Sequence, residues 1–318
     1  MSARPSILLT GKIPSSVVAR LEQVGEVDQF RRDGLDVMPH DELIARIAGK
    51  QALVSMITDS IDRQIIEAGT ELKVIANAAV GYNNIDVAAA RERGIIVTNT
   101  PGVLTDATAD LTWALILGIT RRIGEGERLI RRGEWRGWTF DFMLGAEIRG
   151  KQLGIVGYGG IGRAVAARGR AFGMRVAYTS RTPKDDADAE PMPFDRLLAT
   201  SDVVSLHCPL TPDTRHLIDQ PALARMKRSA YLVNTSRGPV VDEKALAWAL
   251  RTRLIAGAAL DVFEQEPKVE PELFTLDNVL LVPHLGSGTV ETRTAMADLA
   301  VRNVAAVLSG QAALTPVP

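Results

Sequence analysis

Short apolar segments alternate with segments of helical periodicity along almost the whole chain. In the first hundred residues four apolar segments predict strands, and patterns of helical spacing follow the first three. We place these strands at residues 6–10, 52–57, 73–78 and 95–99, and helices at residues 15–24, 62–68 and 85–93. Strands that alternate with helices in this way predict a parallel sheet with helices on both faces.

The second half of the chain repeats this alternation after one long helical segment. That segment covers residues 105–132, and Gly133 and the Trp-rich stretch 135–140 end it. Later strands are predicted at residues 153–156, 175–179, 203–206, 231–234, 256–261 and 279–282, with helices at 163–172, 194–200 and 243–251. A final helix at residues 289–308 does not fit the second sheet and is expected to cross back to the first. The pattern therefore predicts an α/β chain with two doubly wound parallel-sheet domains.

The composition mainly argues against certain kinds of site and partner. The chain has 318 residues, with 37 Lys and Arg against 38 Asp and Glu, so its net charge of −1 gives no reason to expect a nucleic-acid or membrane surface. Cys208 is the only cysteine, so no internal disulfide can form, and no metal site is expected. We see neither a signal peptide nor an apolar run of about 20 residues, and expect a cytoplasmic protein.

A glycine-rich turn separates the strand at residues 153–156 from the helix that follows. It is Gly157-Tyr158-Gly159-Gly160-Ile161-Gly162, and it has the strand–turn–helix context of a dinucleotide-binding turn. The first glycine permits a tight turn, the second lets the backbone approach a pyrophosphate, and the third allows close packing of helix and strand. The free N–H groups of the helix then face the phosphates. We therefore predict a dinucleotide site; a glycine turn without a ligand is the alternative.

The residues after the next strand bear on the choice between NAD(H) and NADP(H). An acidic residue about 20 positions on would hold the ribose hydroxyls of NAD, but Ser180-Arg181-Thr182 stand there. Arg181 can pair with a 2′-phosphate, assisted by Lys184. The nearest acids, Asp185 and Asp186, lie farther along the loop. The sequence favours NADP(H); the alternative is that Arg181 is a solvated charge and both cofactors are accepted.

Three motifs stand directly after strands of the second series. They are Asn234-Thr235-Ser236-Arg237-Gly238-Pro239-Val240-Val241-Asp242, Asp261-Val262-Phe263-Glu264-Gln265-Glu266-Pro267 and Pro283-His284-Leu285-Gly286-Ser287. Doubly wound sheets bind ligands at the carboxyl ends of their strands. An arginine, one or two glutamates and a histidine are therefore expected to converge there.

Those residue types suit the reduction of a ketone by hydride transfer. Charge develops on the ketone oxygen, so a proton donor must stand beside it, and histidine titrates near neutrality. A carboxylate next to an imidazole favours its protonated form, and a guanidinium can bind the substrate carboxylate and polarise the carbonyl. The chain has four histidines, His40, His207, His216 and His284. We expect His40 in a polar loop and take His284 as the candidate acid; a purely structural histidine is the alternative.

Together these motifs resemble the D-isomer-specific 2-hydroxyacid dehydrogenase family, and within it the glyoxylate/hydroxypyruvate reductases. The resemblance covers nearly the whole chain, and it includes Val80-Gly81-Tyr82-Asn83-Asn84-Ile85-Asp86 and His207-Cys208-Pro209-Leu210-Thr211. It implies a Rossmann cofactor domain at residues 101–287. It also implies a flavodoxin-like substrate domain built from residues 1–100 and 288–318, which accounts for the final helix. The implied reaction is the NAD(P)H-dependent reduction of a small 2-oxo acid, such as glyoxylate or hydroxypyruvate, to the D-2-hydroxy acid.

The resemblance also implies roles for single residues. Arg237 is similar to the substrate-binding arginine of the family, Glu266 to the partner of the histidine, and His284 to the acid/base. Glu264 is then a bystander. Members of the family are usually homodimers, and the long helix with the loop at residues 135–140 is the implied contact surface.

Substrate and cofactor contacts are implied at further positions. The main-chain amides around Val80 and Gly81 would hold the substrate carboxylate, and Met56 would lie near the substrate side chain. The implied cofactor-lining positions are Thr108, Gly157, Tyr158, Gly159, Gly160, Ile161, Gly162, Ser180, Arg181, Thr182, His207, Cys208, Pro209, Thr214, Thr235, Ser236, Arg237, Asp261, His284, Gly286 and Ser287.

Other branches of the family fit the sequence less well. Glutamine replaces Glu266 in formate dehydrogenases, a lysine replaces Val80 in phosphite dehydrogenases, and many phosphoglycerate dehydrogenases carry a further C-terminal domain that is not expected here. Two alternatives stay open. One is a dehydrogenase for another D-2-hydroxy acid, such as D-lactate or a longer aliphatic or aromatic acid. The other is a cofactor-sensing binding protein like the family's transcriptional co-repressors, although no extended tail is expected after the last helix.

Overall fold

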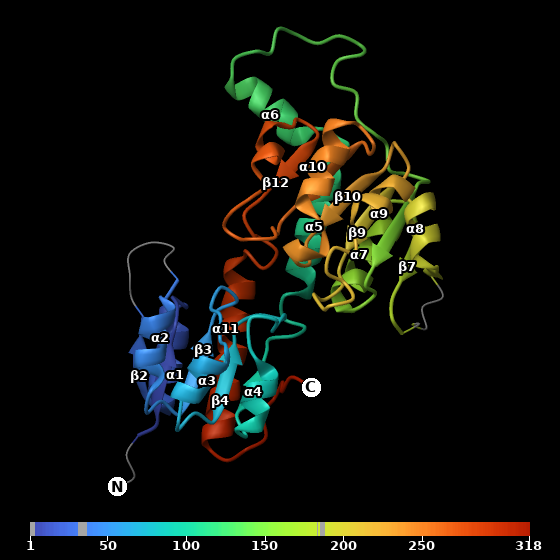
Figure 1. The fold of residues 1–318 in the computed structure, drawn as a ribbon. Coiled ribbons are helices and arrows are strands. Elements are labelled where there is room, and N and C mark those ends of the chain that lie inside the picture. The colour runs from blue at the N-terminus through green and yellow to red at the C-terminus, as the bar shows by residue number, and fades with distance from the viewer. Residues whose placement is uncertain (1–3, 31–36, 183, 185–187) are drawn as a thin grey trace. The chain divides into compact units, whose positions relative to one another are not determined.

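The computed structural model describes residues 4–30, 37–182, 184 and 188–318 (Figure 1). The chain divides into two compact units, one formed by Met1–Leu104 with Thr289–Pro318 and the other by Thr105–Gly288. Each unit contains its own parallel sheet. The predicted fold class, two doubly wound α/β domains, is confirmed.

The first unit is built on a five-stranded parallel sheet in the order β2-β1-β3-β4-β5. This is the strand order of flavodoxin-like sheets. The strands are β1 (Ser6–Leu9), β2 (Glu26–Gln29), β3 (Ala52–Ser55), β4 (Val74–Asn77) and β5 (Ile96–Thr98). The helices are α1 (Ser15–Val24), α2 (His40–Ile47), α3 (Arg63–Ala68), α4 (Val87–Glu92) and α11 (Val290–Leu308).

Apolar side chains cover both faces of this first sheet. On one face, residues of β1 and β3 such as Ile7 and Val54 pack with Ala300 and Val304 of α11. On the other, strand residues such as Leu8 pack with the side chains of α2 and α3. Strands that are buried on both faces are apolar throughout, which is why this sheet could be recognised from the sequence. The last helix therefore packs on the first sheet, as expected.

The second unit is built on a seven-stranded parallel sheet in the order β12-β11-β10-β9-β6-β7-β8. This is the Rossmann order extended by one strand. The strands are β6 (Gln152–Val156), β7 (Arg175–Thr179), β8 (Glu190–Pro191), β9 (Val203–Leu206), β10 (Tyr231–Asn234), β11 (Gly257–Leu260) and β12 (Val279–Leu281). The helices are α5 (Thr105–Thr120), α6 (Ile123–Arg131), α7 (Gly160–Ala171), α8 (Phe194–Thr200), α9 (Gln220–Arg225) and α10 (Glu243–Arg251), with short 3-10 helices at Gly238–Val240 and Pro271–Thr275.

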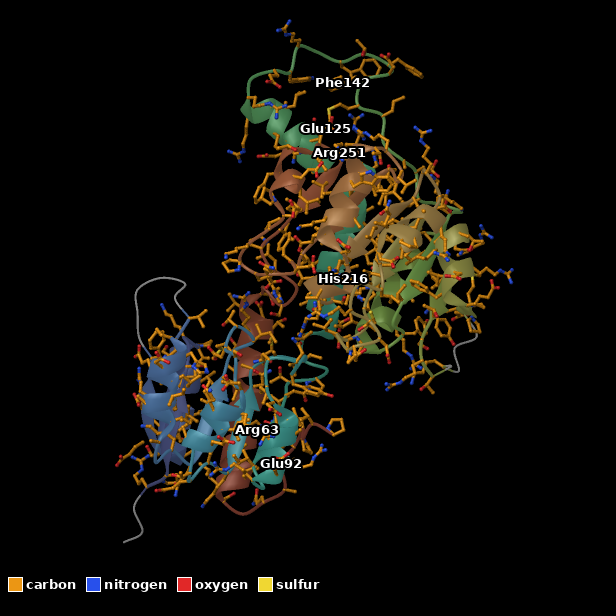
Figure 2. All side chains as sticks on the ribbon, viewed as in Figure 1. Arg63, Glu92, Glu125, Phe142, His216 and Arg251 are labelled. Carbon is orange, nitrogen blue, oxygen red and sulfur yellow. The ribbon has the colours of Figure 1, made fainter. Side chains whose placement is uncertain are left out.

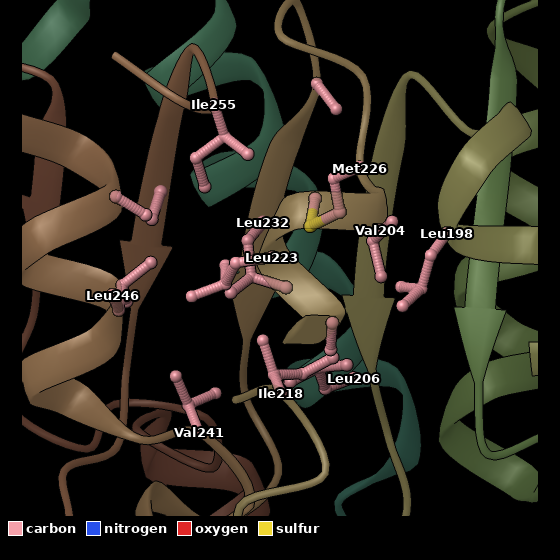
Figure 3. Close-up of a cluster of buried hydrophobic side chains, with 14 of the residues drawn as sticks. Leu198, Val204, Leu206, Ile218, Leu223, Met226, Leu232, Val241, Leu246 and Ile255 are labelled. Carbon is pink, nitrogen blue, oxygen red and sulfur yellow. The ribbon is translucent and has the colours of Figure 1, made fainter. Parts of the chain in front are cut away.

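The core of the second unit lies on both faces of its sheet. Figure 3 shows one face, where Leu198 of α8, Leu223 of α9 and Leu246 of α10 pack over strand residues such as Val204 and Leu232. On the other face, residues of α5 and α7 form a second buried cluster. Aspartates begin several helices, and the Asp242 carboxylate, for example, accepts the N–H of Ala245 at the start of α10. This packing holds the carboxyl ends of the strands in fixed positions.

One predicted helix is wrong at its centre. The helical pattern at residues 105–132 is interrupted between α5 and α6, because Arg122 adopts the left-handed conformation, with φ of +55°. Its guanidinium pairs with the Glu125 carboxylate at 2.6 Å (Glu125 is labelled in Figure 2). Neither glycine nor proline stands at the break, so the sequence carried no signal for it.

Some elements of the first unit were not predicted. His40 was expected in a loop, but it is the first residue of α2, and its Nε2 lies 2.8 Å from the Asp62 carboxylate. The buried Leu43 and Ile47 have helical spacing in a segment too short to stand out. β2 was missed because this edge strand has the polar sequence Glu-Val-Asp-Gln. Among the helices of the described residues, none is long and apolar enough to cross a membrane.

Candidate active site

The predicted site residues of the second unit follow the carboxyl ends of its strands. Gly157 follows β6, Ser180 follows β7, His207 follows β9, Thr235 follows β10 and Asp261 follows β11. All of these strands are parallel, so their carboxyl ends form one edge of the sheet. That edge is where doubly wound sheets bind ligands.

The three glycines of the turn differ in the space around them. Gly159 has open space beside it, whereas main-chain atoms lie close to Gly157 and Gly162. Gly157 has φ of +95°, and a Cβ there would lie 2.5 Å from the main-chain nitrogen of Cys208. A Cβ on Gly162 would lie 2.3 Å from the Gly157 carbonyl oxygen, so α7 packs directly on the turn. At Gly159 a Cβ would meet no atom of the described residues within 4 Å. The open position, together with a helix that begins without a side-chain cap, fits the pyrophosphate of a dinucleotide.

The segment after β7 is folded back on that strand. The Tyr178 hydroxyl donates to the Lys184 carbonyl at 2.8 Å and accepts the Lys184 N–H at 3.0 Å, while the Ser180 hydroxyl donates to the Thr182 carbonyl at 2.6 Å. The Arg181 side chain is exposed. Asp185 and Asp186, which entered the argument about the cofactor, lie outside the described residues.

Tyr158 differs from its neighbours in the glycine turn. Its ring is buried and stacks on Tyr178, with 4.1 Å between the ring centroids. A contact with a bound dinucleotide would therefore have to come from the main chain of Tyr158. The stack joins the glycine turn, expected at the pyrophosphate, to the end of β7, expected at the ribose of the cofactor.

His284 and Glu266 form an ion pair. His284 Nδ1 lies 2.8 Å from Glu266 Oε2, and each side chain keeps about one-third of its surface exposed, 34% and 33%. The second carboxylate oxygen, Oε1, accepts the Phe263 N–H at 3.0 Å. Because Nδ1 faces the carboxylate, Nε2 is the ring nitrogen available to a ligand.

Glu266 is held in its ionised form. Burial alone would raise its pKa, but the hydrogen bond and charge of His284, the Phe263 N–H and the charge of Arg237 outweigh that effect, and the pKa of Glu266 lies below its ordinary value. The carboxylate is therefore charged near neutral pH. A charged carboxylate at this distance stabilises a protonated imidazole.

The backbone at His284 is fixed by Asp261. The His284 N–H donates to the Asp261 carbonyl at 2.8 Å, and the Asp261 carboxylate accepts the N–H groups of Leu285 at 2.5 Å and Gly286 at 2.9 Å. His284 itself has φ of +52°, a left-handed conformation that is uncommon for a residue with a side chain. Such strain is concentrated at functional sites. Burial raises the pKa of Asp261, against the effect of these N–H groups.

Arg237 stands on a turn that Asn234 braces. The Asn234 side chain donates to the Arg237 carbonyl at 3.0 Å and accepts the Ser236 N–H at 3.0 Å. Burial lowers the pKa of Arg237, and the negative charge of Glu266 opposes that shift. At Gly238 a Cβ would lie only 1.8 Å from the Phe263 carbonyl oxygen, so the arginine motif and the glutamate motif touch through their main chains.

Other predicted cofactor residues are held by local hydrogen bonds. The Thr108 hydroxyl donates to the Gly286 carbonyl at 3.2 Å, and the Thr235 hydroxyl lies 2.9 Å from that of Thr112. The Thr214 hydroxyl donates to the Pro209 carbonyl at 2.6 Å. Pro209 and Ser287 both expose part of their surface at the carboxyl edge of the sheet.

His207 and Cys208 lack the properties of acid/base groups or nucleophiles at neutral pH. His207 Nε2 lies 2.8 Å from the Ser205 hydroxyl, and its Nδ1 is buried with no hydrogen-bond partner among the described residues. Burial lowers the pKa of His207 to about 3 and raises the pKa of the Cys208 thiol to about 11. His284 is thus the better candidate for proton transfer.

In the first unit, asparagines at the ends of two neighbouring strands hold the loop that contains Val80 and Gly81. Asn99 Nδ2 donates to the Val80 carbonyl at 2.7 Å, and Asn77 Nδ2 donates to the Gly81 carbonyl at 2.9 Å. In a planar trans peptide unit, the carbonyl of one residue and the N–H of the next residue point in opposite directions. The N–H groups of Gly81 and Tyr82 are therefore directed away from the asparagines, where an anion can meet them.

The Met56 loop is held by a second buried network. The Met56 N–H donates to the Asp59 carboxylate at 2.7 Å, and Asn84 Nδ2 donates to the Met56 carbonyl at 3.2 Å. Asp59 is buried, and burial raises its pKa despite the hydrogen bonds from Thr10 and Met56. Asn77, Asn99 and Asp59 were missed in the sequence. Polar residues directly after apolar strands were the available signal.

Comparison with known proteins shows which family the chain belongs to. The model of the D-isomer specific 2-hydroxyacid dehydrogenase NAD binding domain matches residues 113–286. Over 316 residues the chain is 46% identical to the glyoxylate reductase of Thermococcus litoralis, covering 97% of this chain and 95% of that protein. The chain belongs to the D-isomer specific 2-hydroxyacid dehydrogenase family. This dehydrogenase is therefore an oxidoreductase with a nicotinamide-binding domain.

Solved structures agree with this assignment. A glyoxylate reductase from Paecilomyes thermophila superposes with a TM-score of 0.90 at 37% identity, covering 100% of this dehydrogenase and 99% of that chain. An NADPH-dependent glyoxylate/hydroxypyruvate reductase from Sinorhizobium meliloti, solved with NADP and malonate, gives 0.88 at 36% identity, covering 99% and 97%. The dehydrogenase therefore shares its fold with these proteins along nearly its whole length.

Proposed function

We propose that this dehydrogenase reduces a small 2-oxo acid, such as glyoxylate or hydroxypyruvate, to the D-2-hydroxy acid. The observation that carries the proposal is the His284–Glu266 ion pair of 2.8 Å at the carboxyl edge of a dinucleotide-binding sheet. A charged carboxylate stabilises the imidazolium, which is the form that can donate a proton. The relatives named glyoxylate reductase, at 46% and 37% identity, support the substrate class.

The mechanism assigns one role to each of three side chains. The glycine turn Gly157–Gly162 would hold NADPH, which would supply the hydride that reduces the keto carbon. His284 donates a proton from Nε2 to the keto oxygen, so that one hydride and one proton convert the ketone to the alcohol. Glu266 remains ionised and balances the charge of the imidazole, and Arg237 binds the substrate carboxylate and polarises the carbonyl. The N–H groups of Gly81 and Tyr82 are further proposed partners of that carboxylate.

NADP(H) is the proposed cofactor. At the end of β7, where an acidic residue would bind the ribose of NAD, stand Ser180 and the exposed Arg181. A guanidinium there can form two hydrogen bonds with a 2′-phosphate. The Sinorhizobium meliloti relative is described as NADPH-dependent, which supports the same preference.

A homodimer is the proposed assembly. The segment after α6 exposes large aromatic side chains, with Trp138 74% and Phe140 89% exposed, and Phe142 stands close to them in the chain (Figure 2). Contiguous exposed apolar side chains mark an interaction surface. Light scattering on the purified protein should give the mass of a dimer, and Trp138→Ser with Phe140→Ser should shift the equilibrium towards the monomer. A monomeric wild-type protein would contradict this assembly.

A panel of substrates and cofactors tests the proposed function. Purified protein is mixed with NADPH or NADH and offered glyoxylate, hydroxypyruvate, pyruvate and phenylpyruvate, while the absorbance of the reduced cofactor is followed. We expect the highest kcat/KM with NADPH and glyoxylate or hydroxypyruvate. Preference for pyruvate or phenylpyruvate would indicate another D-2-hydroxyacid dehydrogenase, and no turnover with any acid would favour a cofactor-sensing binding protein.

A further inference from the structure

Glu266 stands on a short loop whose two ends are bound to one side chain. The loop runs from Phe263 to Glu270, and within it the Lys268 N–H donates to the Gln265 carbonyl at 2.8 Å, which closes a tight turn around Glu266. At its ends, the N–H groups of Glu264 and Glu270 both donate to the Glu243 carboxylate. The second of these hydrogen bonds measures 3.0 Å. A single carboxylate thus holds both ends of the loop that carries the partner of His284.

Glu243 is well placed to hold that loop rigidly. It is the first residue of α10, it is only 5% exposed, and its own N–H donates to Glu264 Oε2 at 3.2 Å. The other oxygen of Glu264 lies 2.5 Å from His216 Nε2, which adds a further tie to the loop (His216 is labelled in Figure 2). Glu264, expected to be a bystander, therefore joins the loop to α10 and to His216. The catalytic role was assigned to Glu266 alone, so nothing in the mechanism uses this network.

We propose that Glu243 is a positioning residue, which sets the distance between Glu266 and His284 by fixing both ends of the loop that carries Glu266. The proposal rests on the proposed function in so far as His284 is the proton donor. The reason is geometric: two N–H groups need two acceptor oxygens in one rigid group, and a carboxylate offers them. A glutamine has one acceptor oxygen and a donor N–H₂ group in place of the second oxygen, so one of the two main-chain N–H groups would face the N–H₂ group and lose its partner.

Weakening this tie leaves the contacts of Glu264 in place, so a partial loss of activity is expected. In Glu243→Gln we expect kcat to fall about tenfold, less than the 10²- to 10⁴-fold effect of removing a general acid. The affinity for NADPH should change by less than about twofold, because the loop is separate from the glycine turn. The KM for glyoxylate should also change by less than about twofold, so the loss should fall on kcat.

A double-mutant cycle distinguishes positioning from general stabilisation. Glu243→Gln is combined with Glu266→Gln; if Glu243 acts through Glu266, it should change kcat by less than about twofold in that background. Glu272→Gln is the matched control, because Glu272 lies on the 3-10 helix that follows the loop and its carboxylate pairs with Arg251 at 2.5 Å (Arg251 is labelled in Figure 2). It should leave kcat and KM unchanged. Equal effects of Glu243→Gln in both backgrounds would overturn the proposal.

Two measurements do not depend on turnover. In wild-type protein the N–H groups of Glu264 and Glu270 should exchange with solvent much more slowly than that of Gln265; equal rates would overturn the proposal even if Glu243→Gln fails to fold. In Glu243→Gln the exchange of these two N–H groups should become faster while that of the Gln265 N–H stays unchanged, and unchanged rates for all three groups would also overturn it. If the exchange rates change as expected but no 2-oxo acid is reduced, the tie to Glu243 is supported and the proposed substrate class is wrong.

Discussion

Two glycines of the dinucleotide turn should respond to the same substitution in opposite ways. Gly159 has ordinary backbone angles, φ −83° and ψ −161°, and a Cβ there meets nothing of the described structure within 4 Å. Gly157 has φ of +95°, and its Cβ would lie 2.5 Å from the Cys208 nitrogen and 2.6 Å from the His207 carbonyl carbon. Gly159→Ala should therefore preserve the fold and obstruct the cofactor, whereas Gly157→Ala should damage the fold itself.

The magnitudes follow from these contacts. For Gly157→Ala, the left-handed backbone costs about 1–2 kcal/mol and the overlap with main-chain atoms about 1–3 kcal/mol. For a protein unit of this size, that loss should lower the Tm by roughly 5–15 °C. For Gly159→Ala, the methyl group should displace the pyrophosphate from at least one N–H group, a charge-assisted hydrogen bond of about 1.5–3 kcal/mol. The Kd for NADPH should rise about 10- to 150-fold at unchanged Tm.

The assay is a thermal melt and a fluorescence titration with NADPH for each variant. Wild-type affinity in Gly159→Ala would refute the position of the pyrophosphate, because the added methyl group would then lie outside the cofactor site. A large fall in the Tm of Gly159→Ala would show that the space beside this residue is not open. A wild-type melt of Gly157→Ala would contradict the close approach of the turn to His207 and Cys208.

Three further changes test single contacts. Arg181→Ala should weaken NADPH binding about 10- to 100-fold and leave NADH almost unaffected, because it removes a charge-assisted hydrogen bond to the 2′-phosphate; equal effects on both cofactors in the titration would contradict that contact. Asn99→Asp replaces the amide that donates to the Val80 carbonyl, so the KM for glyoxylate should rise about tenfold with an unchanged Kd for NADPH; steady-state kinetics showing an unchanged KM would count against the Gly81 and Tyr82 cradle. His207 has a folded pKa of about 3, below its ordinary 6.5, so its contribution to stability is present above pH 6.5 and is lost as the pH falls towards 3. Denaturant melts of His207→Gln between pH 6.5 and pH 5 should show a shallower loss of the free energy of unfolding, by up to about 1.4 kcal/mol for each pH unit, and an unchanged slope would argue against a buried neutral ring.

The sheets were predictable because their strands are buried on both faces. Segments such as Ala52–Ser55 and Val74–Asn77 are buried throughout, which leaves a continuous apolar run in the sequence. The edge strand Glu26–Gln29 has no such run, and it was missed. The break between α5 and α6 depends on the left-handed conformation of Arg122. No glycine or proline stands at this position to indicate it in the sequence.

The candidate site was predictable only in part. Strand–motif spacing placed the segments of Arg237, Glu266 and His284 at the carboxyl edge of one sheet, and the family resemblance singled out these residues. The bracing residues Glu243, Asn77 and Asn99 were not found, because their partners are main-chain groups, which any residue type offers. The two asparagines stand at the ends of apolar strands, which was an available signal, but that position does not show which main-chain group each of them binds.

The account depends most directly on proton donation by His284. The decisive measurement compares wild type with His284→Gln for the kcat of NADPH oxidation by glyoxylate, together with the Kd for NADPH. Loss of the general acid should lower kcat about 10²- to 10⁴-fold, while the Kd stays within about twofold of wild type. Turnover close to that of the wild type, or a collapse of NADPH binding, would contradict the assignment of His284 as the proton donor.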